Sequence, residues 1–418
     1  MHIRTRTTCR VCGSSSLKQV VDLGPQYLQG SFVKPGKEMP STRKIPCTLV
    51  RCNPEVDEHA CGLLQMEHSV PPEILYAAYW YRSGTNNTMR NHLKGIVDSV
   101  TPIIENNKAV VLDIGCNDGT LLNYYPETYK KFGVDPSDVA QEVENATVVQ
   151  DIFPSDRLNV ALKGSKVDII TSIAMFYDLE DPVQFVKNIK GVLSEKGVWV
   201  VEMSYMPAML ELDSYDTICH EHLEYYSFAL LEKICAMAGM KIFKILFNDI
   251  NGGSICCYVT HGDNASYDTS EAYKLISATR QKEFDMELDT DKPYMAFNAR
   301  INKLKSELYG LLLTYKKEGK RIHIYGASTK GNTILQWCGI DSTQIDYAAE
   351  RNPDKYGAYT LGTNIPIISE EESRAMNPDY YLVLPWHFKE EFLEREKETL
   401  AKGIGLIFPL PKIEIYKK

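Results

Sequence analysis

The sequence predicts an α/β protein with two doubly wound sheets and a small lobe at its N-terminus. Two long stretches alternate strands with helices, a pattern typical of parallel sheets that are covered on both faces. Residues 1–72 are instead rich in turns and concentrate cysteine. For a chain of 418 residues, at roughly 150 residues a domain, we expect domains over 1–72, 73–265 and 266–418.

The composition is that of a soluble globular protein, with 44% hydrophobic and 24% charged residues. A formal net charge of −9 disfavours a nucleic-acid partner, because phosphate binding needs a basic face. No apolar run approaches the roughly 18 residues of a membrane span, and the first residues lack the apolar core of a secretory signal. The 11 cysteines fit reduced thiols. We therefore expect a cytoplasmic protein that binds neither nucleic acid nor membrane. We also expect a monomer or small homo-oligomer.

The N-terminal lobe carries two cysteine pairs separated by tens of residues. Such pairs are typical of a four-thiolate zinc site, which closes tetrahedrally and stabilises a small lobe. The predicted ligands of a structural zinc ion are Cys9, Cys12, Cys52 and Cys61. The loop within the second pair is wider than usual, so Cys47 or His59 could replace one ligand. A redox C-x-x-C is an alternative, but it belongs in a βαβ context that is absent here, and free thiols are another.

The central part begins with a strand over 110–114, which leads through a glycine turn into a helix starting near residue 120. Further strands are expected over 131–134, 147–150, 167–172 and 197–202, with a helix over 183–193. A helix over 229–238 ends at Gly239, and two antiparallel strands follow over 241–248 and 254–261. The sequence thus predicts a parallel sheet that closes with an antiparallel pair.

The third part is mostly helical over 270–319, with a weak break at 291–293, and then becomes a second α/β unit. Its strands are expected over 321–325, 344–349, 380–384 and 405–408. The turn 326–332, before a helix over 333–338, offers backbone N–H groups and a lysine to an anion. We expect it to hold a diphosphate through Ser328, Lys330 and Asn332; a plain tight turn is the alternative.

The turn after the strand 110–114 has the pattern D-x-G-x-x-x-G, formed by Asp113, Gly115 and Gly119. A dinucleotide site would instead have the array G-x-G-x-x-G over a pyrophosphate. An acid-rich turn suits a ligand with a cationic amino-acid end and no phosphate, as in S-adenosylmethionine. Asp135 ends the second strand, where an acid can bind both ribose hydroxyls. A strand–turn–helix junction without a ligand is the alternative.

Other residues near the strand ends complete the predicted cofactor site. Asp151 would meet the exocyclic amine of adenine, beside an apolar wall for the ring, and Met175 lies where the sulfonium end is expected. The predicted cofactor-binding residues are Asp113, Gly115, Asn117, Gly119, Asp135, Pro136, Asp151, Ile152, Phe153 and Met175.

Residues 213–227 gather two histidines, four carboxylates and three tyrosines near the expected carboxyl end of a strand. Open α/β sheets bind their ligands at that edge. Histidine titrates near working pH, so His220 or His222 can serve as a general base, and the adjacent Glu221 can fix its tautomer and raise its basicity. Either histidine alone could merely cap the next helix or make a core hydrogen bond. Burying the whole cluster without a purpose would be costly.

The segment 76–89 combines aromatic and polar side chains between the lobe and the central sheet. The aromatic residues could form an interface core, and the polar ones, Arg82, Ser83, Asn86 and Asn87, could line a ligand; both interpretations stay open.

Together these motifs resemble the nucleotide-sugar C-methyltransferases of deoxysugar pathways. The similarity runs through residues 9–13, 113–119, 220–222, 325–331 and 384–386, and so covers nearly the whole chain. It implies a three-part enzyme: a zinc lobe, a central class I S-adenosylmethionine-dependent methyltransferase domain of Rossmann-like fold, and a C-terminal Rossmann-like domain that helps to hold a nucleotide-diphosphate sugar. The histidine that matches His222 is the expected general base, next to the carboxylate that matches Glu221.

The resemblance implies that His222 removes a proton beside a 4-keto group, at C-3, and that the carbanion attacks the methyl group of the cofactor. Cys219 stands where some relatives are expected to have tyrosine, so the donor to the enolate oxygen would be Tyr79, Tyr81 or Tyr225. Predicted substrate contacts are Tyr81, Asn86, His220, Tyr225, Ser328, Lys330 and Asn332. Methylation of a sugar oxygen or nitrogen is one alternative, and a zinc-ribbon binding module with a non-catalytic scaffold is another.

Overall fold

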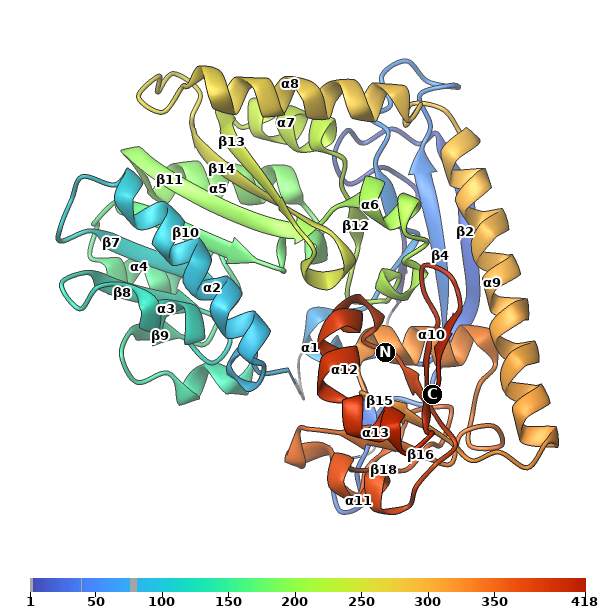
Figure 1. Ribbon diagram of the computed structural model, residues 1–418. Coiled ribbons are helices and arrows are strands. Elements are labelled where there is room, and N and C mark those ends of the chain that lie inside the picture. Colours follow the sequence, from blue (N-terminus) through green and yellow to red (C-terminus); the bar gives the residue numbers. More distant parts are fainter. Residues whose placement is uncertain (1–2, 39, 76–80) are drawn as a thin grey trace.

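The computed structural model describes residues 3–38, 40–75 and 81–418, and Tyr79, one of the predicted catalytic residues, lies outside this part of the chain. The described residues form a central seven-stranded sheet, a C-terminal six-stranded sheet and a four-stranded sheet built mainly from the N-terminal lobe (Figure 1). This architecture confirms the predicted fold class. None of the described helices is long and apolar enough to cross a membrane.

The central sheet has the strand order β13-β14-β11-β10-β7-β8-β9. Strands β7 to β11 are mutually parallel, and β14 runs antiparallel between β11 and β13 as the sequence predicts. The bounds are β7 (Val110–Ile114), β8 (Lys130–Val134), β9 (Thr147–Val149), β10 (Val167–Ile173), β11 (Leu193–Ser204), β13 (Met240–Asn248) and β14 (Ser254–His261). Each predicted strand of this part is present, although β11 begins earlier than expected.

Helices cover both faces of the central sheet because side chains alternate across each strand. Val111 packs in one apolar cluster with Leu93 of α2, and Leu112 packs in another with Phe185 of α5. The helices of this part are α2 (Asn87–Val100), α3 (Thr120–Tyr124), α4 (Asp156–Leu162), α5 (Pro182–Val192), α6 (Met206–Glu211), α7 (Phe228–Met237) and α8 (Ser270–Asp285).

The C-terminal sheet has the order β18-β16-β15-β19-β20-β21, parallel except for the last strand. Its strands are β15 (Ile322–Tyr325), β16 (Tyr347–Glu350), β18 (Ile367–Ser369), β19 (Tyr380–Val383), β20 (Gly405–Phe408) and β21 (Glu414–Tyr416). Its helices are α9 (Lys292–Lys317), α10 (Thr329–Cys338), α11 (Glu370–Ala375), α12 (Lys389–Arg395) and α13 (Lys397–Ala401), with α9 running beside the N-terminal lobe (Figure 1). The predicted helix over 333–338 was too short, because Ser328 caps α10 by accepting the N–H of Gly331.

The N-terminal lobe is joined to both other parts by strand pairing. Its sheet has the order β12-β5-β4-β2, and the edge strand β12 comes from the central part of the chain. The strand β3 pairs with β17 of the C-terminal part. The bounds are β1 (Arg4–Thr5), β2 (Leu17–Gln26), β3 (Phe32–Val33), β4 (Ile45–Cys52), β5 (Leu64–Met66), β6 (His68–Ser69), α1 (Pro72–Leu75), β12 (Glu224–Tyr225) and β17 (Tyr359–Thr360).

Short 3-10 turns connect many of these elements. They are η1 (Ser83–Thr85), η2 (Thr101–Ile103), η3 (Asp138–Glu142), η4 (Phe176–Asp178), η5 (Tyr215–Thr217), η6 (Ile250–Gly252), η7 (Pro353–Lys355) and η8 (Trp386–Phe388).

Candidate active site

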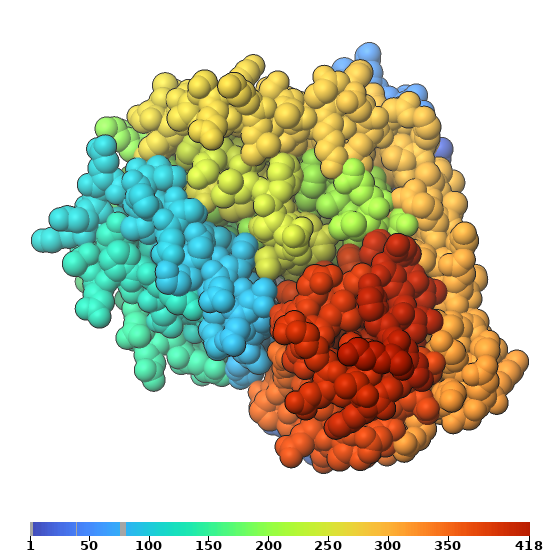
Figure 2. Space-filling model, viewed as in Figure 1, coloured from blue at the N-terminus to red at the C-terminus, as the bar shows by residue number. Residues whose placement is uncertain are grey.

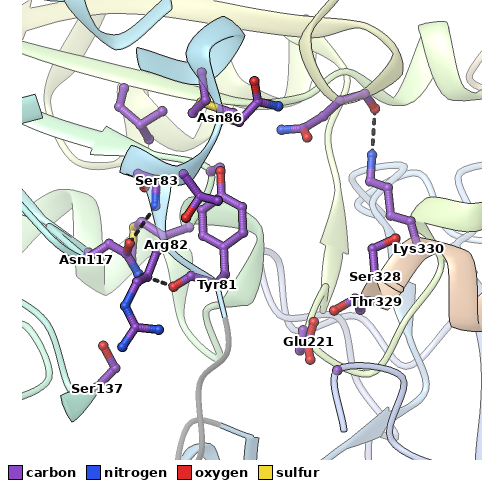
Figure 3. A pocket seen from close by; sticks show the side chains of 18 of the residues that line it. Tyr81, Arg82, Ser83, Asn86, Asn117, Ser137, Glu221, Ser328, Thr329 and Lys330 are labelled. Atoms are coloured by element: carbon purple, nitrogen blue, oxygen red, sulfur yellow. Dashed lines mark hydrogen bonds between the residues drawn. The ribbon is translucent and has the colours of Figure 1, made fainter. Parts of the chain in front are cut away.

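A cavity of about 570 Å³ lies where the carboxyl ends of the two large sheets meet. Residues after β7, β8 and β10 form one wall, and residues after β15, β16 and β19 form the opposite wall (Figure 3). In each sheet the strand order reverses beside the first strand, and ligands of open α/β sheets bind at such a point. The volume is within the range of small-molecule sites.

The glycine turn after β7 is held in place by the acid that directly follows β8. Asp135 accepts the backbone N–H of Asn117 at 2.9 Å and that of Ser137 at 2.8 Å. Gly115 has φ +76°, and a Cβ atom there would lie 3.3 Å from Met175. Because Gly115 has no side chain, a ligand in the cavity can approach the backbone of the turn closely.

Burial shifts the pKa of Asp113, the acid that precedes this turn. Asp113 is buried and accepts a hydrogen bond from the hydroxyl of Thr171 at 2.6 Å. Desolvation raises the pKa of Asp113 to about 7. Nine of the ten predicted cofactor-binding residues line the cavity, namely Asp113, Gly115, Asn117, Asp135, Pro136, Asp151, Ile152, Phe153 and Met175.

Gly119 is the exception among them. It does not line the cavity; it precedes α3 with φ +72°, and a Cβ atom there would lie 2.6 Å from Val143. Its positive φ forms the left-handed residue that precedes the helix, and its contact with the cofactor stays a prediction.

His222 lines the same cavity, and its tautomer is set by the backbone. Its Nδ1 lies 2.8 Å from the carbonyl oxygen of Thr217, which can only accept, so Nδ1 carries the proton and Nε2 is left as an acceptor. Its ring packs against Tyr177 with centroids 4.2 Å apart. Burial and the nearby cation of Lys330 lower the pKa of His222 to about 4, so the imidazole is neutral near pH 7.

Glu221 does not orient His222, contrary to the expectation that this carboxylate fixes its tautomer. It points instead toward Thr329 at the start of α10 (Figure 3). Burial raises the pKa of Glu221 to about 7, so a protonated carboxyl that can donate a hydrogen bond is populated near neutral pH. Glu221 lines the cavity beside His222.

Three predicted substrate contacts do not line the cavity, because each has partners elsewhere in the protein. The ring nitrogens of His220 lie 2.7 Å from Gln29 Oε1 and 3.2 Å from the carbonyl of Ile45. The hydroxyl of Tyr225 donates to the carbonyl of Thr217 at 3.3 Å. The amide of Asn332 donates to the carbonyl of Gln29 at 2.6 Å. His220 and Asn332 thus contact the N-terminal lobe and Tyr225 contacts its own loop, and a substrate contact by these three side chains stays a prediction.

The opposite wall carries the predicted anion site at the start of α10. Ser328 and Lys330 both line the cavity, and Lys330 Nζ donates to the carbonyl of Asn251 at 2.6 Å (Figure 3). Burial lowers the pKa of Lys330, and Asp216 raises it.

The segment that enters the central part lies across the glycine turn. The amide of Asn117 donates to the carbonyl of Tyr81 at 3.1 Å and accepts the N–H of Ser83 at 3.0 Å. Tyr81 and Asn86, which are predicted substrate contacts, both line the cavity. Arg82 bridges Glu142 at 2.7 Å and Asp354 at 3.2 Å, so the segment also contacts the C-terminal lobe, where α2 abuts it (Figure 2).

Comparisons with known proteins agree with this division of the chain. Three family models match in succession: a zinc binding domain over residues 9–76, a methyltransferase domain over 87–245, and a C-methyltransferase C-terminal domain over 249–411. The C-methyltransferase NovU of Streptomyces niveus is 26% identical over 416 residues, which covers 98% of this chain and 97% of that protein. These three matches and this relative show that the chain is an S-adenosylmethionine-dependent methyltransferase, similar along its length to C-methyltransferases.

Other likenesses are partial. A tRNA U34 carboxymethyltransferase of Campylobacter jejuni is 26% identical over 152 residues, covering 32% of this chain and 50% of that protein. A crystal structure of an S-adenosylmethionine-dependent methyltransferase from Clostridium acetobutylicum matches with 14% identity and a TM-score of 0.33, covering 41% of this chain and 90% of that one. The crystal structure of the magnesium protoporphyrin IX methyltransferase of Synechocystis with bound SAH matches with 12% identity and a TM-score of 0.33. The match covers 42% of this chain and 87% of that one.

In the lobe of this methyltransferase, the four predicted thiols lie together and fit a zinc ion. Sulfur–sulfur distances are 3.4 Å for Cys9–Cys61 and for Cys12–Cys52, and all four atoms lie within 4.8 Å of one another. Four sulfurs at about 2.3 Å from zinc would be separated by about 3.8 Å. Of the alternative ligands, Cys47 is buried against Gln29, and His59 is exposed beside Glu58. Zinc in this site would stabilise the lobe.

Sequence reasoning missed several cavity residues of the enzyme on its C-terminal wall. Glu350 ends β16 and accepts the N–H of Ala327 at 2.9 Å, and Lys355 donates to the carbonyl of Ala327 at 2.6 Å. His387 lines the cavity with its Nδ1 buried and lacking a hydrogen-bond partner within the described residues. Glu350 had a visible signal, because it ends a second strand as Asp135 does. His387 had none beyond its place after β19.

Proposed function

We propose that the enzyme methylates a nucleotide-diphosphate 4-keto sugar at the carbon next to the ketone, at C-3. The observation that carries this proposal is the orientation of His222. Its Nδ1–H is committed to the carbonyl of Thr217, which leaves Nε2 to accept a proton in the cavity. A positioned base is what the removal of a proton beside a carbonyl needs.

The charge state of His222 suits this role. Its lowered pKa keeps the ring neutral at physiological pH, and burial together with Lys330 causes that shift. A dianionic diphosphate at Ser328 and Lys330 would offset the lysine cation and make His222 a stronger base when the substrate is bound. The substrate would thereby help to activate the group that deprotonates it.

The oxygen of the forming enolate needs a donor or a cation. Tyr225 is unsuited, since its hydroxyl is directed to Thr217, and Tyr79 lies outside the described residues. We assign this role to the protonated carboxyl of Glu221, assisted by the ammonium of Lys330, because both line the cavity with His222. Tyr81, which is half exposed on the cofactor wall, remains a candidate for a substrate contact.

The wall formed by residues after β7, β8 and β10 would hold the methyl donor. S-adenosylmethionine supplies an electrophilic methyl group when bound. The turn at Gly115 would accept its amino-acid end, Asp135 its ribose, and Asp151 its adenine. The loop that carries His222 lies against the loop after β10, which carries Met175, because Leu223 donates its N–H to the carbonyl of Tyr177 at 2.7 Å. The base therefore stands at the boundary between the two predicted subsites.

The test uses His222→Asn with a panel of nucleotide-linked 4-keto sugars. We expect loss of methylation and loss of deuterium uptake at the carbon beside the ketone in D₂O, with S-adenosylmethionine affinity retained in calorimetry. His323→Asn is the control, because His323 is buried in the C-terminal sheet against Ser373 and does not line the cavity. NMR of the product locates the methyl group; a methyl on oxygen or nitrogen, or full activity of His222→Asn, overturns the proposal.

A further inference from the structure

The loop that carries His222 continues directly into the sheet of the zinc lobe. Strand β12 begins two residues after His222 and pairs antiparallel with β5, Glu224 opposite Gln65 and Tyr225 opposite Leu64. Met66 also donates its N–H to the carbonyl of Leu223 at 2.8 Å. The position of the base therefore depends on the lobe as well as on the central sheet.

A single arginine inside the thiol motif is at the centre of this junction. Arg10 lies between Cys9 and Cys12, and its side chain is fully buried. One terminal nitrogen donates to the carbonyl of Met66 at 2.7 Å, and the other donates to the hydroxyl of Ser69 at 2.8 Å. The guanidinium is thus fixed to the strand that pairs with β12.

The remaining nitrogen of Arg10 faces two carboxylates from two different segments. Its Nε lies 3.8 Å from Glu224, the first residue of β12 directly after the His222 loop, and 3.5 Å from Glu180, on the loop after β10. The second loop also supplies Tyr177, whose ring packs against His222. One cation therefore faces both loops that surround the base.

We propose that Arg10 is a positioning residue, which holds the His222 loop and the loop after β10 in the arrangement that methyl transfer requires. The thiol site fixes the backbone on either side of Arg10, so the lobe contributes to the geometry of the reaction as well as to the stability of the fold. This inference rests on the proposed role of His222 as the base.

The test compares two buried arginines of the same lobe. Arg10→Lys keeps the positive charge but loses the planar guanidinium group, whose N–H donors point in fixed directions. The matched control is Arg51→Lys: Arg51 is equally buried but pairs with Asp291 at 2.6 Å, and neither residue lines the cavity. For both variants we would measure kcat, KM, S-adenosylmethionine affinity, zinc content, thermal unfolding, and deuterium uptake by the sugar in D₂O.

We expect Arg10→Lys to lower kcat and deuterium uptake together, by up to about 10²-fold, the loss that follows a misplacement of about 1 Å. Cofactor affinity and zinc content should stay unchanged. Arg51→Lys should lower only the unfolding temperature. Equal kcat values for the two variants would overturn the inference.

A second variant covers the case in which Arg10→Lys fails to fold or loses zinc. Glu224→Met removes the carboxylate at the start of β12, directly after the His222 loop, and leaves the thiol motif intact. It should reproduce the loss of kcat with a full complement of zinc, and wild-type kcat in this variant would also overturn the inference. Full activity of His222→Asn would instead refute the proposed function, so the two failures can be told apart.

Discussion

A Cβ atom on Gly30 would lie 2.1 Å from Oε1 of Glu221 and 3.4 Å from Oγ1 of Thr329. Gly30 belongs to the N-terminal lobe, Glu221 to the histidine loop, and Thr329 to the first turn of α10. All three parts of the chain therefore meet at one carboxyl group in the cavity. The absence of a side chain at Gly30 is what allows Glu221 to lie there.

Gly30→Ala should displace Glu221 and lower kcat by about tenfold or more, because the added methyl occupies the space of the carboxyl group. Affinity for S-adenosylmethionine should not change, since the cofactor turn lies on the other wall. Steady-state kinetics and calorimetry measure the two effects. Gly95→Ala is the control, as Gly95 is exposed in α2 with open space around it. Unchanged kcat in Gly30→Ala would show that Glu221 has no role in the reaction.

The pH dependence of kcat/KM should report the lowered pKa of His222. Burial disfavours the imidazolium. As the pH is lowered, kcat/KM should therefore decrease along an acid limb with an apparent pKa near 4, and not near the ordinary histidine value of about 6.5. Lys330→Met removes a cation that lowers this pKa, so the limb should move to higher pH. Lys355→Met, which removes another partly buried lysine of the cavity, should leave the apparent pKa of this acid limb unchanged. If the apparent pKa of the acid limb is the same in the wild type and both variants, Lys330 does not affect the pKa of the base.

The sequence was sufficient where the structure depends on local pattern. The apolar run of β7, the acid at its end and the glycine turn are contiguous, so residues that line one wall of the cavity could be named from sequence. Gly119, which does not line the cavity, was grouped with these residues because a glycine that starts a helix and a glycine that faces a ligand look alike in sequence.

The roles of the two neighbouring histidines could not be separated from sequence. They differ only in their partners: His220 contacts Gln29, 191 residues away, whereas His222 contacts Thr217 in its own loop. The first contact depends on how the N-terminal lobe docks, which no local pattern encodes. The same docking explains Asn332, whose partner is also Gln29.

Zinc content should depend on the four clustered thiols and not on the other lobe cysteine. Cys61→Ser should release zinc and lower the unfolding temperature, because a structural zinc site contributes folding free energy directly. Cys47→Ser should keep zinc, as Cys47 lies against Gln29 and Ile218. Metal analysis of both purified variants measures this. Zinc retained in Cys61→Ser and lost in Cys47→Ser would reassign the ligand.

Gly115→Ala should weaken cofactor binding more than it weakens the fold. The residue has φ +76°, a conformation that costs a non-glycine residue about 1–2 kcal/mol, and the added methyl would press against Met175 at 3.3 Å. Relief of that contact moves either the turn or Met175, both of which line the predicted cofactor subsite. We therefore expect S-adenosylmethionine affinity to fall by about tenfold or more, equivalent to about 1.4 kcal/mol. Gly119→Ala is the comparison, because its clash is with Val143 outside the cavity: it should lower the unfolding temperature with a smaller effect on affinity. Calorimetry that finds the larger loss of affinity in Gly119→Ala would place the cofactor on a different part of the turn.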